Sequence, residues 1–293
     1  MKKLFCKLID GVWSVFRICS DIRSIRESLG RIESRLAKIE GASGLRDHEF
    51  KVYSQWGDDG IIDYLTEIVP FERKLFVEFG VEDYSESNTR FLMVNKNWSG
   101  LVLDSSKSKI GRVKRSKVSW QHELNAMVSF ITRENINDLL RRGGVSGDIG
   151  LLSVDIDGND YWIWEAISEV LPRIVVVEYN SRLGSEKAIT IPYSADFERA
   201  KAHHSMIYFG ASLRALVKLG DRKGYAFVGC NSAGVNAYFV RRDVLPRDWP
   251  LASVESEFVR ARVREARNEV GGLAYLTPEE EAKILAALPW VEV

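Results

Sequence analysis

The sequence predicts an α/β domain built on a mainly parallel sheet that ends in an antiparallel hairpin, with a coiled-coil helix in front of it. Three observations predict this class. Apolar residues recur at heptad spacing over residues 8–39, strand-like runs alternate with helical segments over residues 74–179, and two strand-like runs flank a short loop over residues 225–242. Alternation of strands and helices produces βαβ units, in which helices cover both faces of a parallel sheet.

The heptad spacing defines a narrow apolar seam along the N-terminal helix. Position a is occupied by Leu8, Val15, Ile22, Leu29 and Leu36, and position d by Ile18, Ile25, Ile32 and Ile39. In a parallel coiled coil Asp21 would face Arg26 of a second helix, and Arg35 would face Glu40. Isoleucine at d disfavours two strands, so we expect a homo-oligomer, either a trimer or a tetramer. The alternative is an amphipathic helix that packs on its own domain, although such helices usually show a wider apolar stripe.

We divide the chain into three parts. Residues 1–41 form the N-terminal helix and coiled coil, residues 42–51 form a linker containing glycine and polar residues, and residues 52–293 form the α/β domain. Within the first part, residues 1–17 combine lysines with Phe5 and Trp13, a composition that suits a helix lying in a membrane interface. The alternative is that the coiled coil simply begins at residue 4.

Composition excludes several classes of function. Lys+Arg and Asp+Glu both number 41, so the formal net charge is zero, and we expect no nucleic-acid partner. Cys6, Cys19 and Cys230 have no spacing typical of a zinc site or a disulfide framework, which favours a reducing compartment. Charges interrupt the N-terminal apolar run too often for a signal peptide, and no run is long enough to span a membrane. We therefore expect a cytoplasmic protein. Its N-terminal helix could make peripheral contact with the inner membrane.

The elements of the domain follow from its apolar runs. The expected strands are residues 74–80, 100–104, 117–124, 149–155 and 173–179, followed by the hairpin strands 225–230 and 236–242. The expected helices are residues 86–96, 133–142 and 161–171. In open α/β sheets ligands bind beyond the carboxyl ends of the strands, so the residues at these ends are the candidates for a functional site.

The first two strands indicate a nucleoside-containing cofactor. The first strand ends at Glu78 and Gly80, where a glycine lets the backbone approach a ligand closely. Asp104 ends the second strand, roughly 20 residues after the glycine, where a carboxylate can bind both hydroxyls of a ribose. Glu82 and Tyr84 occupy positions at which small residues would be expected. This spacing is shared by S-adenosylmethionine and dinucleotide sites, and the alternative is a plain buried strand and turn.

Acidic residues gather after the next two strands. Asp155, Asp157 and Asp160 lie within six residues at the end of one strand, and Glu178 and Asn180 end the neighbouring strand. Buried together without partners, the carboxylates would repel one another. Asp155, Glu178 and Asn180 would offer three oxygen ligands to Mg²⁺ or another hard divalent cation. The alternatives are helix capping by Asp157 or Asp160 and pairing of a carboxylate with an arginine.

Two adjacent histidines lie in the long segment after the strand that ends at Glu178. His203 or His204 could act as a general base toward a hydroxyl group of the substrate. A hydrogen-bonded structural role is the alternative for either residue.

Taken together, these segments resemble the FkbM-type methyltransferase family. The matching stretches are YSQWGDDGII, FVEFGVEDYSESNTRFL, WSGLVLD, LLSVDIDGNDYWIW, VVVEYN and GYAFVGCNSAGVNAYFVRRD, which cover most of residues 52–243. The resemblance implies a Rossmann-like seven-stranded methyltransferase sheet, which the terminal hairpin also favours over a plain dinucleotide-binding fold. It further implies transfer of a methyl group from S-adenosylmethionine to the oxygen of a sugar hydroxyl, as part of bacterial surface-polysaccharide or related glycan synthesis.

The resemblance and the residue patterns together define the expected site. Cofactor binding is assigned to Glu78, Gly80, Glu82, Asn88, Asp104, Ser105 and Asp155, and catalysis to Asp155, Asp157, His203 and His204. Asp155, Glu178 and Asn180 also look like the metal site of catechol-type O-methyltransferases, in which Mg²⁺ holds the acceptor hydroxyls. The turn at Glu82 and Tyr84 departs from the family's glycine-rich form. That departure is the main support for a non-catalytic nucleoside-binding or scaffolding module of the same fold. A nicotinamide-dependent enzyme is a third interpretation, which the terminal hairpin disfavours.

Overall fold

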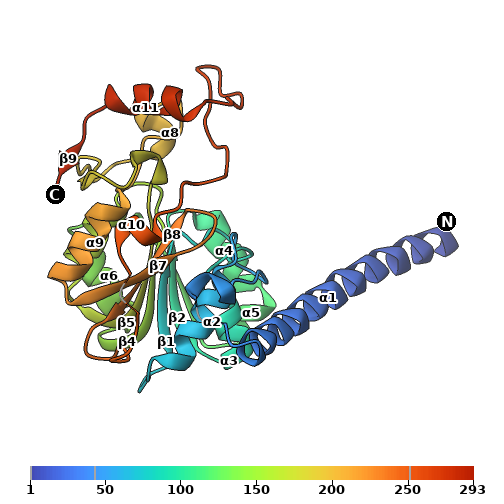
Figure 1. Ribbon diagram of the computed structural model, residues 1–293. Helices are drawn as coiled ribbons and strands as arrows, with labels where there is room; N and C mark the ends of the chain where they lie inside the picture. Colours follow the sequence, from blue (N-terminus) through green and yellow to red (C-terminus); the bar gives the residue numbers. More distant parts are fainter. Residues whose placement is uncertain (1, 43, 251) are drawn as a thin grey trace.

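A seven-stranded sheet lies at the centre of the computed structural model, which describes residues 2–42, 44–250 and 252–293, with only the backbone described for 2–17 and 19 (Figure 1). The strands are β1 (Leu75–Phe79), β2 (Ser99–Asp104), β3 (Leu124–Val128), β4 (Gly147–Val154), β5 (Val170–Glu178), β7 (Tyr225–Cys230) and β8 (Asn236–Arg241). Their order is β3-β2-β1-β4-β5-β8-β7, and β8 is antiparallel to both of its neighbours while the other pairs are parallel. This is the methyltransferase-type sheet with a terminal hairpin that the sequence predicts.

Successive strand residues point to opposite faces of the sheet, and most of them are apolar on both faces. Helices therefore cover both faces. One face packs against α2 (Asp58–Ile68), α3 (Arg90–Lys96), α4 (Lys107–Arg115) and α5 (Lys117–Gln121). The other face packs against α6 (Ile136–Arg142), α7 (Asp160–Ala166) and α9 (Leu213–Arg222). The two faces of β1 show the alternation directly, since Phe76 belongs to the first core and Val77 to the second.

The segment after β5 and the C-terminal part of the chain together form a small cap above the carboxyl ends of the strands (Figure 1). The cap contains β6 (Ile189–Thr190), α8 (Arg199–Ala202), α11 (Pro278–Ala286) and β9 (Val291–Glu292), whereas α10 (Val254–Glu257) packs on the main body beside α9. The strands β6 and β9 pair antiparallel, and a separate apolar cluster formed by Ile191, Ile207, Tyr208, Ala266 and Leu285 holds the cap together. The cap therefore encloses the edge of the sheet at which the sequence places the functional site.

Helix α1 (Lys2–Ile39) projects from this body, and only its C-terminal part contacts it (Figure 1). The side that faces the body is polar or small. Gly30 is buried against Val52, the Ser34 hydroxyl donates to Asp63 at 2.6 Å, and Lys38 pairs with Glu67.

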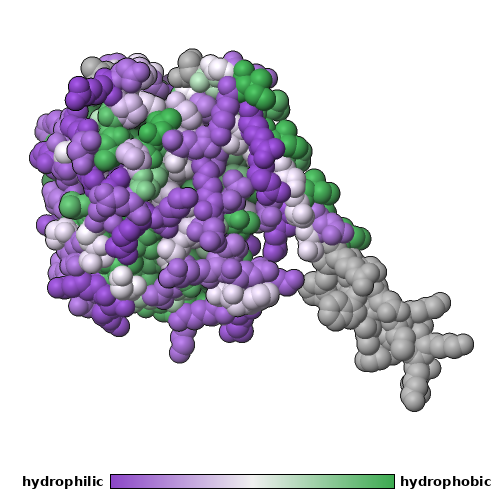
Figure 2. All heavy atoms as spheres, turned by 90° about the horizontal axis from the view of Figure 1, so that it is seen from below, coloured by the Kyte–Doolittle hydropathy of each residue, from purple (hydrophilic) through white to green (hydrophobic). Residues whose placement is uncertain are grey.

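The heptad seam of α1 is largely exposed, although one member, Ile22, also lines a cavity between α1 and the body. Its described members, Ile18, Ile22, Ile25, Leu29, Ile32, Leu36 and Ile39, are each at least 46% exposed. Figure 2 shows hydrophobic side chains following one another along this outer side of the helix. The helix thus packs on its own domain, as the alternative interpretation expected, but with its polar side, and the apolar seam stays open. None of the described helices is long and apolar enough to cross a membrane. The side chains of residues 1–17, to which the membrane-interface prediction applies, lie outside the described part.

The segment predicted as a linker, residues 42–51, contains a 3-10 helix (Leu45–His48) in which Leu45 and His48 are buried. Arg46 of this helix donates to the Cys230 carbonyl oxygen at 3.1 Å. The segment therefore connects α1 to the hairpin formed by β7 and β8.

Two element predictions are wrong. Residues 117–124, predicted as a strand, form α5 followed by the start of β3, and the helix ends where the His122 amide donates to the Val118 carbonyl oxygen. The helix predicted over residues 161–171 ends at Ala166, and β5 already begins at Val170. The Asn137 amide causes this early end, since it donates to the Ala166 carbonyl and accepts from the amides of Ser168 and Glu169.

Candidate functional site

Two neighbouring cavities lie at the carboxyl ends of the parallel strands, beneath the cap. The first has a volume of about 230 Å³ and the second about 570 Å³. Gly80, Glu82, Asp155 and Asp157 line both of them. The cavities are therefore two parts of one site, which the loops after β1 and β4 separate.

The first cavity is built around the end of β2. Asp104 and Ser105 line it together with Ser106, Ser129, Phe130 and Ile131. The Asp104 carboxylate accepts hydrogen bonds from the amides of Glu82, at 2.8 Å, and Ser106, at 2.7 Å. Each carboxylate oxygen retains a further acceptor site, and an aromatic ring and an aliphatic chain form another part of the wall. This combination suits a ribose diol attached to a flat heterocycle.

The turn after β1 brings the two cavities close together. Gly80 has a φ of +72°, and a Cβ atom there would lie 1.7 Å from the Asp155 carbonyl oxygen, so only glycine fits. Glu82 and Tyr84 also have positive φ angles, of 51° and 61°. Both non-glycine residues thus adopt the backbone conformation that a glycine-rich turn would adopt. Tyr84 is held there by burial and by contact between its hydroxyl and that of Thr89 at 2.9 Å.

Glu78 holds the loop that follows this turn. Its buried carboxylate accepts hydrogen bonds from the Ser87 hydroxyl, the Asn88 amide and both donors of Thr89. Burial raises the pKa of Glu78, while these hydrogen bonds act in the opposite direction. Asn88 lines the second cavity, and its side-chain amide reaches Ser153 on β4 at 3.1 Å. Glu78 therefore shapes the site by fixing residues 87–89.

The second cavity is polar and strongly acidic. Glu78, Asp155, Glu178 and Glu265 are among the carboxylates that line it, and Arg199 is the cationic residue in its described lining. The Trp56 ring, from the loop before α2, also reaches this wall. The cavity is large enough for a small organic molecule, and most of its wall can form hydrogen bonds.

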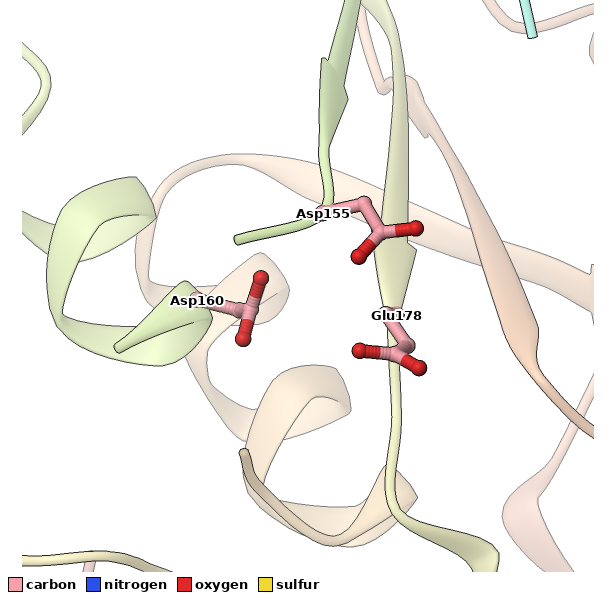
Figure 3. A group of neighbouring side chains, drawn as sticks. All are labelled: Asp155, Asp160 and Glu178. Carbon is pink, nitrogen blue, oxygen red and sulfur yellow. The ribbon is translucent and has the colours of Figure 1, made fainter. Parts of the chain in front are cut away.

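Three carboxylates form a compact cluster in this region (Figure 3). Asp155 follows β4, Glu178 ends the adjacent β5, and Asp160 begins α7. One oxygen atom from each side chain lies within 4.8 Å of the other two. The Asp160 carboxylate also accepts from the amides of Ile156, at 2.8 Å, and Gly158, at 3.0 Å. Asp160 thus both closes the turn before α7 and turns one oxygen toward its two neighbours.

The cluster concentrates negative charge in a buried place. Burial, followed by the charges of Asp157, Asp160 and Glu78, raises the pKa of the Asp155 carboxyl well above its ordinary value. Burial and then the charge of Asp155 raise the pKa of Glu178 in the same way. Burial raises the pKa of Asp160 to about 6, against its backbone hydrogen bonds. The Glu178 Oε2 atom is buried and has no hydrogen-bond partner among the described residues. These groups need either protons or a cationic ligand.

The structure brings together Asp155 and Glu178 as predicted, but it places Asp160 beside them and not Asn180. The Asn180 side-chain amide donates to the carbonyl oxygens of Ile207 and Phe209, and its oxygen accepts from the Arg182 amide. These hydrogen bonds hold the chain after β5. Asp160, and not Asn180, therefore completes the group of three oxygen-bearing side chains.

Asp157 lines both cavities and forms an ion pair with Arg199 at 2.7 Å. Arg199 also pairs with Glu265 and donates to the Met206 carbonyl oxygen, so it ties the loop after β4 to the cap. No local sequence pattern pointed to Arg199, because the carboxylates that it pairs with, Asp157 and Glu265, are 42 and 66 residues away. Phe130 was missed for a similar reason, since it follows β3, whose position was predicted wrongly.

His203 and His204 line neither cavity. The His203 ring contacts the Ser205 hydroxyl at 2.7 Å, and burial lowers its pKa. For His203 this contact fits the hydrogen-bonded structural role that was the alternative, whereas the described contact of His204 is with the His203 ring.

Comparison with known proteins gives structural resemblance alone. No family model and no curated protein sequence matches the chain significantly. Among solved structures, the N-terminal domain of EvdMO1 with SAH bound is 12% identical, with a TM-score of 0.42 over 72% of this chain and 94% of that one. PKMT2 from Rickettsia typhi in complex with AdoHcy is 11% identical, with a TM-score of 0.44 over 69% of this chain and 56% of that one. Geranyl diphosphate C-methyltransferase from Streptomyces coelicolor A3(2), with Mg²⁺ bound, is 10% identical, with a TM-score of 0.40 over 63% of this chain and 81% of that one.

Proposed function

We propose that this chain is an S-adenosylmethionine-dependent O-methyltransferase that acts on a sugar hydroxyl of a bacterial surface polysaccharide or a related glycan. The observation that carries the proposal is the pair of cavities that share Gly80 and Asp155 at the carboxyl edge of the sheet. One cavity has the groups that a nucleoside needs, and the other has room for an acceptor beside it. The sequence resemblance to FkbM-type methyltransferases points to the same reaction.

The adenosine of the cofactor would occupy the first cavity. Asp104 would accept from the ribose hydroxyls, with Ser105 beside it, and the Phe130 ring would pack on the adenine. The methionine part would pass Gly80, where the missing side chain keeps the backbone accessible. Its cationic sulfonium would then lie near Asp155, whose negative charge favours a cation.

The acceptor would occupy the second cavity. A sugar ring offers several hydroxyls to the polar wall, and the Trp56 indole offers an apolar surface for the ring face. Holding the acceptor oxygen in line with the methyl group would supply proximity and orientation, which can account for much of the barrier reduction. We assign the removal of the hydroxyl proton to the Asp155 and Glu178 carboxylates, because both histidines lie outside the cavity.

The carboxylate cluster also fits a divalent cation. Asp155, Asp160 and Glu178 can each supply an oxygen, and the buried, unpartnered Glu178 Oε2 is the kind of atom that such an ion would satisfy. Bound there, Mg²⁺ or a similar ion would lower the proton affinity of an acceptor hydroxyl. In its presence the three side chains would be fully ionised and would hold their positions around it.

The alternative of a non-catalytic scaffold of the same fold loses its main support. That support was the substitution of Glu82 and Tyr84 for small residues in the turn. Both residues adopt left-handed backbone conformations, and the Glu82 amide hydrogen-bonds to Asp104. The backbone geometry that we propose for nucleoside binding is thus compatible with these side chains.

Assembly belongs to the proposal as well. We propose that α1 forms a parallel coiled coil, a trimer or tetramer, because its exposed seam keeps heptad spacing while its polar side contacts the body. Several linked sites would favour repeated action on a long glycan. We place the protein in the cytoplasm, since Cys230 is a buried free thiol, and we propose contact of the first 17 residues with the inner membrane.

Isothermal calorimetry with adenosylmethionine, adenosylhomocysteine and NAD tests the function directly. We expect both adenosyl compounds to bind with one site per chain and NAD to bind far more weakly. Binding of NAD alone would assign the chain to nicotinamide chemistry. Absence of binding by all three ligands would favour the scaffold.

A further inference from the structure

Arg90 is a buried arginine without a counter-ion. The structure buries three arginines, Arg90, Arg173 and Arg182, to 8%, 7% and 8% exposure. Arg173 pairs with Asp148 at 2.8 Å, and Arg182 pairs with Glu281 at 3.1 Å. Among the described side chains, Arg90 has no carboxylate within ion-pair distance. An uncompensated buried charge is costly, so an anion bound beside Arg90 would stabilise it.

The contacts that Arg90 does make leave part of its guanidinium unsatisfied. One of its terminal nitrogens donates to the Tyr84 carbonyl oxygen, and its carbon lies 4.5 Å from the centre of the Tyr53 ring. Its Nε atom is buried and has no hydrogen-bond partner in the described structure. Neutral groups thus surround the cation without neutralising it.

Arg90 opens onto a third cavity, which two more arginines line. This cavity has a volume of about 210 Å³ and lies between α1 and the domain, with a lining of Ile22, Arg23, Arg26, Val52, Tyr53, Ser85 and Arg90. All charged residues of this described lining are arginines. Arg26 donates to the Val52 carbonyl oxygen, and Arg23 has no described ion pair. Burial lowers the pKa of Arg90, and the charge of Arg23 lowers it further.

Two described carboxylates contact the wall of this cavity without lining it. Glu27 accepts a hydrogen bond from the Tyr53 hydroxyl, and Asp83 accepts one from the Ser85 hydroxyl. Three positively charged side chains therefore line this cavity. Such a space suits one anionic group of a larger molecule, and arginine forks match the oxygens of a phosphate.

The third cavity adjoins the acceptor cavity. Ser85 lines both of them. The acceptor cavity is acidic and would repel a phosphate, whereas the arginine cavity would attract it. We propose that the arginine cavity binds a phosphate-type anion carried by the acceptor, so that the acceptor is a phosphorylated sugar. The identity of the carrier rests on the proposed function, but the anion site itself does not.

Calorimetric titration of the full-length protein with inorganic pyrophosphate, at constant ionic strength, tests the site. We expect saturable binding with one site per chain, whether or not adenosylhomocysteine is present. Arg23→Gln should weaken binding at least about fivefold, because a charge-assisted hydrogen bond is lost. Arg23 is exposed, so this variant should fold, and Arg35→Gln, an exposed change on the same helix outside the cavity, is the matched control.

Equal binding by wild type and Arg23→Gln, or equal loss in Arg35→Gln, would overturn the site. Binding that appears only after the α1 assembly is dissociated would overturn it too, because the arginines would then pair with a second copy. Adenosylhomocysteine binding is measured in the same samples, so a failed anion site is distinguishable from a failed methyltransferase assignment.

Competition then identifies the carrier. Glucose 1-phosphate should displace pyrophosphate while glucose does not, which supports a phosphorylated acceptor. Displacement by phosphatidylglycerol vesicles that depends on Arg23, with phosphatidylcholine vesicles inactive, would assign the cavity to a lipid headgroup and overturn the acceptor assignment.

Discussion

Asp104 has two roles that depend on the same carboxylate. Its oxygens hold the turns after β1 and β2 through the amides of Glu82 and Ser106, and they line the first cavity, which we propose binds the nucleoside. A carboxylate that already accepts two backbone hydrogen bonds stays in place and needs no rearrangement when a ribose arrives. This preorganisation would increase the affinity for the cofactor.

Asp104→Ala should weaken adenosylhomocysteine binding by about 1–3 kcal/mol, the usual consequence of leaving charged hydrogen bonds unmade. Calorimetry measures the change, and Asp104→Asn, which keeps the size and one acceptor, should lose less. Unchanged affinity in a folded Asp104→Ala variant would contradict the assignment.

The carboxylate cluster should make the stability of the protein depend on pH. The folded state holds protons on Asp155, Asp160 and Glu178 that the unfolded chain releases near pH 4. In EDTA, therefore, the free energy of unfolding should fall as the pH rises from about 4 through about 6, the pKa of Asp160, and further as Asp155 and Glu178 titrate. Urea unfolding at pH 5 and pH 7.5 measures this loss.

Asp155→Asn is the matched variant for this experiment, because it removes one charge and keeps the shape. Its stability should vary less with pH than that of wild type. Added Mg²⁺ or Mn²⁺ should stabilise wild type more at pH 7.5 than at pH 5, since the ligands must be deprotonated. Identical pH profiles for the two proteins, with no effect of either metal, would remove the cluster from the proposed mechanism.

Residue positions at strand ends could be predicted well from the sequence, but their hydrogen-bond partners could not. Asp155 and Glu178 were expected to be neighbours because β4 and β5 are adjacent and parallel, and they are. The third member of the group was predicted to be Asn180 and is Asp160. This difference depends on the direction that each side chain takes after its strand. Asn180 turns toward the carbonyls of Ile207 and Phe209, a contact across almost 30 residues that no local pattern reveals.

At the scale of elements, long apolar runs were located correctly and short ones were not. Strands β1, β2, β4 and β5 are buried on both faces and read as continuous apolar runs. Residues 117–121 contain one buried residue, Val118, and an exposed Trp120, so their pattern carries almost no information about packing. The early end of α7 is likewise set by the Asn137 side chain, from a different helix.

Gly30 gives a prediction whose sign depends on the packing of α1. In an isolated helix, alanine is about 1 kcal/mol more favourable than glycine. Here a Cβ atom would lie 2.4 Å from Val52 and 3.2 Å from Phe91. Gly30→Ala should therefore destabilise the domain by about 1–3 kcal/mol through overpacking, measured by urea unfolding. Stabilisation would mean that α1 does not pack on the domain. Ser20→Ala, at an exposed position of the same helix, is the control.

For the molecule as a whole, the orientation of α1 decides how the chain meets other copies. The domain takes the polar side of the helix, which leaves the apolar seam for a second α1. Figure 2 shows exposed hydrophobic side chains in a row along the helix. The heptad spacing could be predicted from the sequence, whereas the contact of the opposite side with the domain could not.

Substitution within the seam tests the assembly without removing the helix. Ile25→Lys combined with Ile32→Lys places charges at two d positions that are 57% and 50% exposed in the single chain. The mass per particle from light scattering should fall to that of a monomer, because a buried lysine in the seam is costly. Glu33→Lys, exposed and outside the seam, should leave the mass unchanged. The same mass in all three proteins would exclude the seam as the interface.

The contacts of Arg199 and Glu265 also have a consequence for synthesis on the ribosome. The residues of the nucleoside cavity all lie between positions 80 and 197, whereas the acceptor cavity also needs Asn236 and Glu265. As the chain is synthesised, the residues of the first cavity are therefore available before those of the second, whose wall is complete only after Glu265 has emerged. The strands β7 and β8 of the central sheet also emerge between these two stages, so the sheet is complete before the second cavity is.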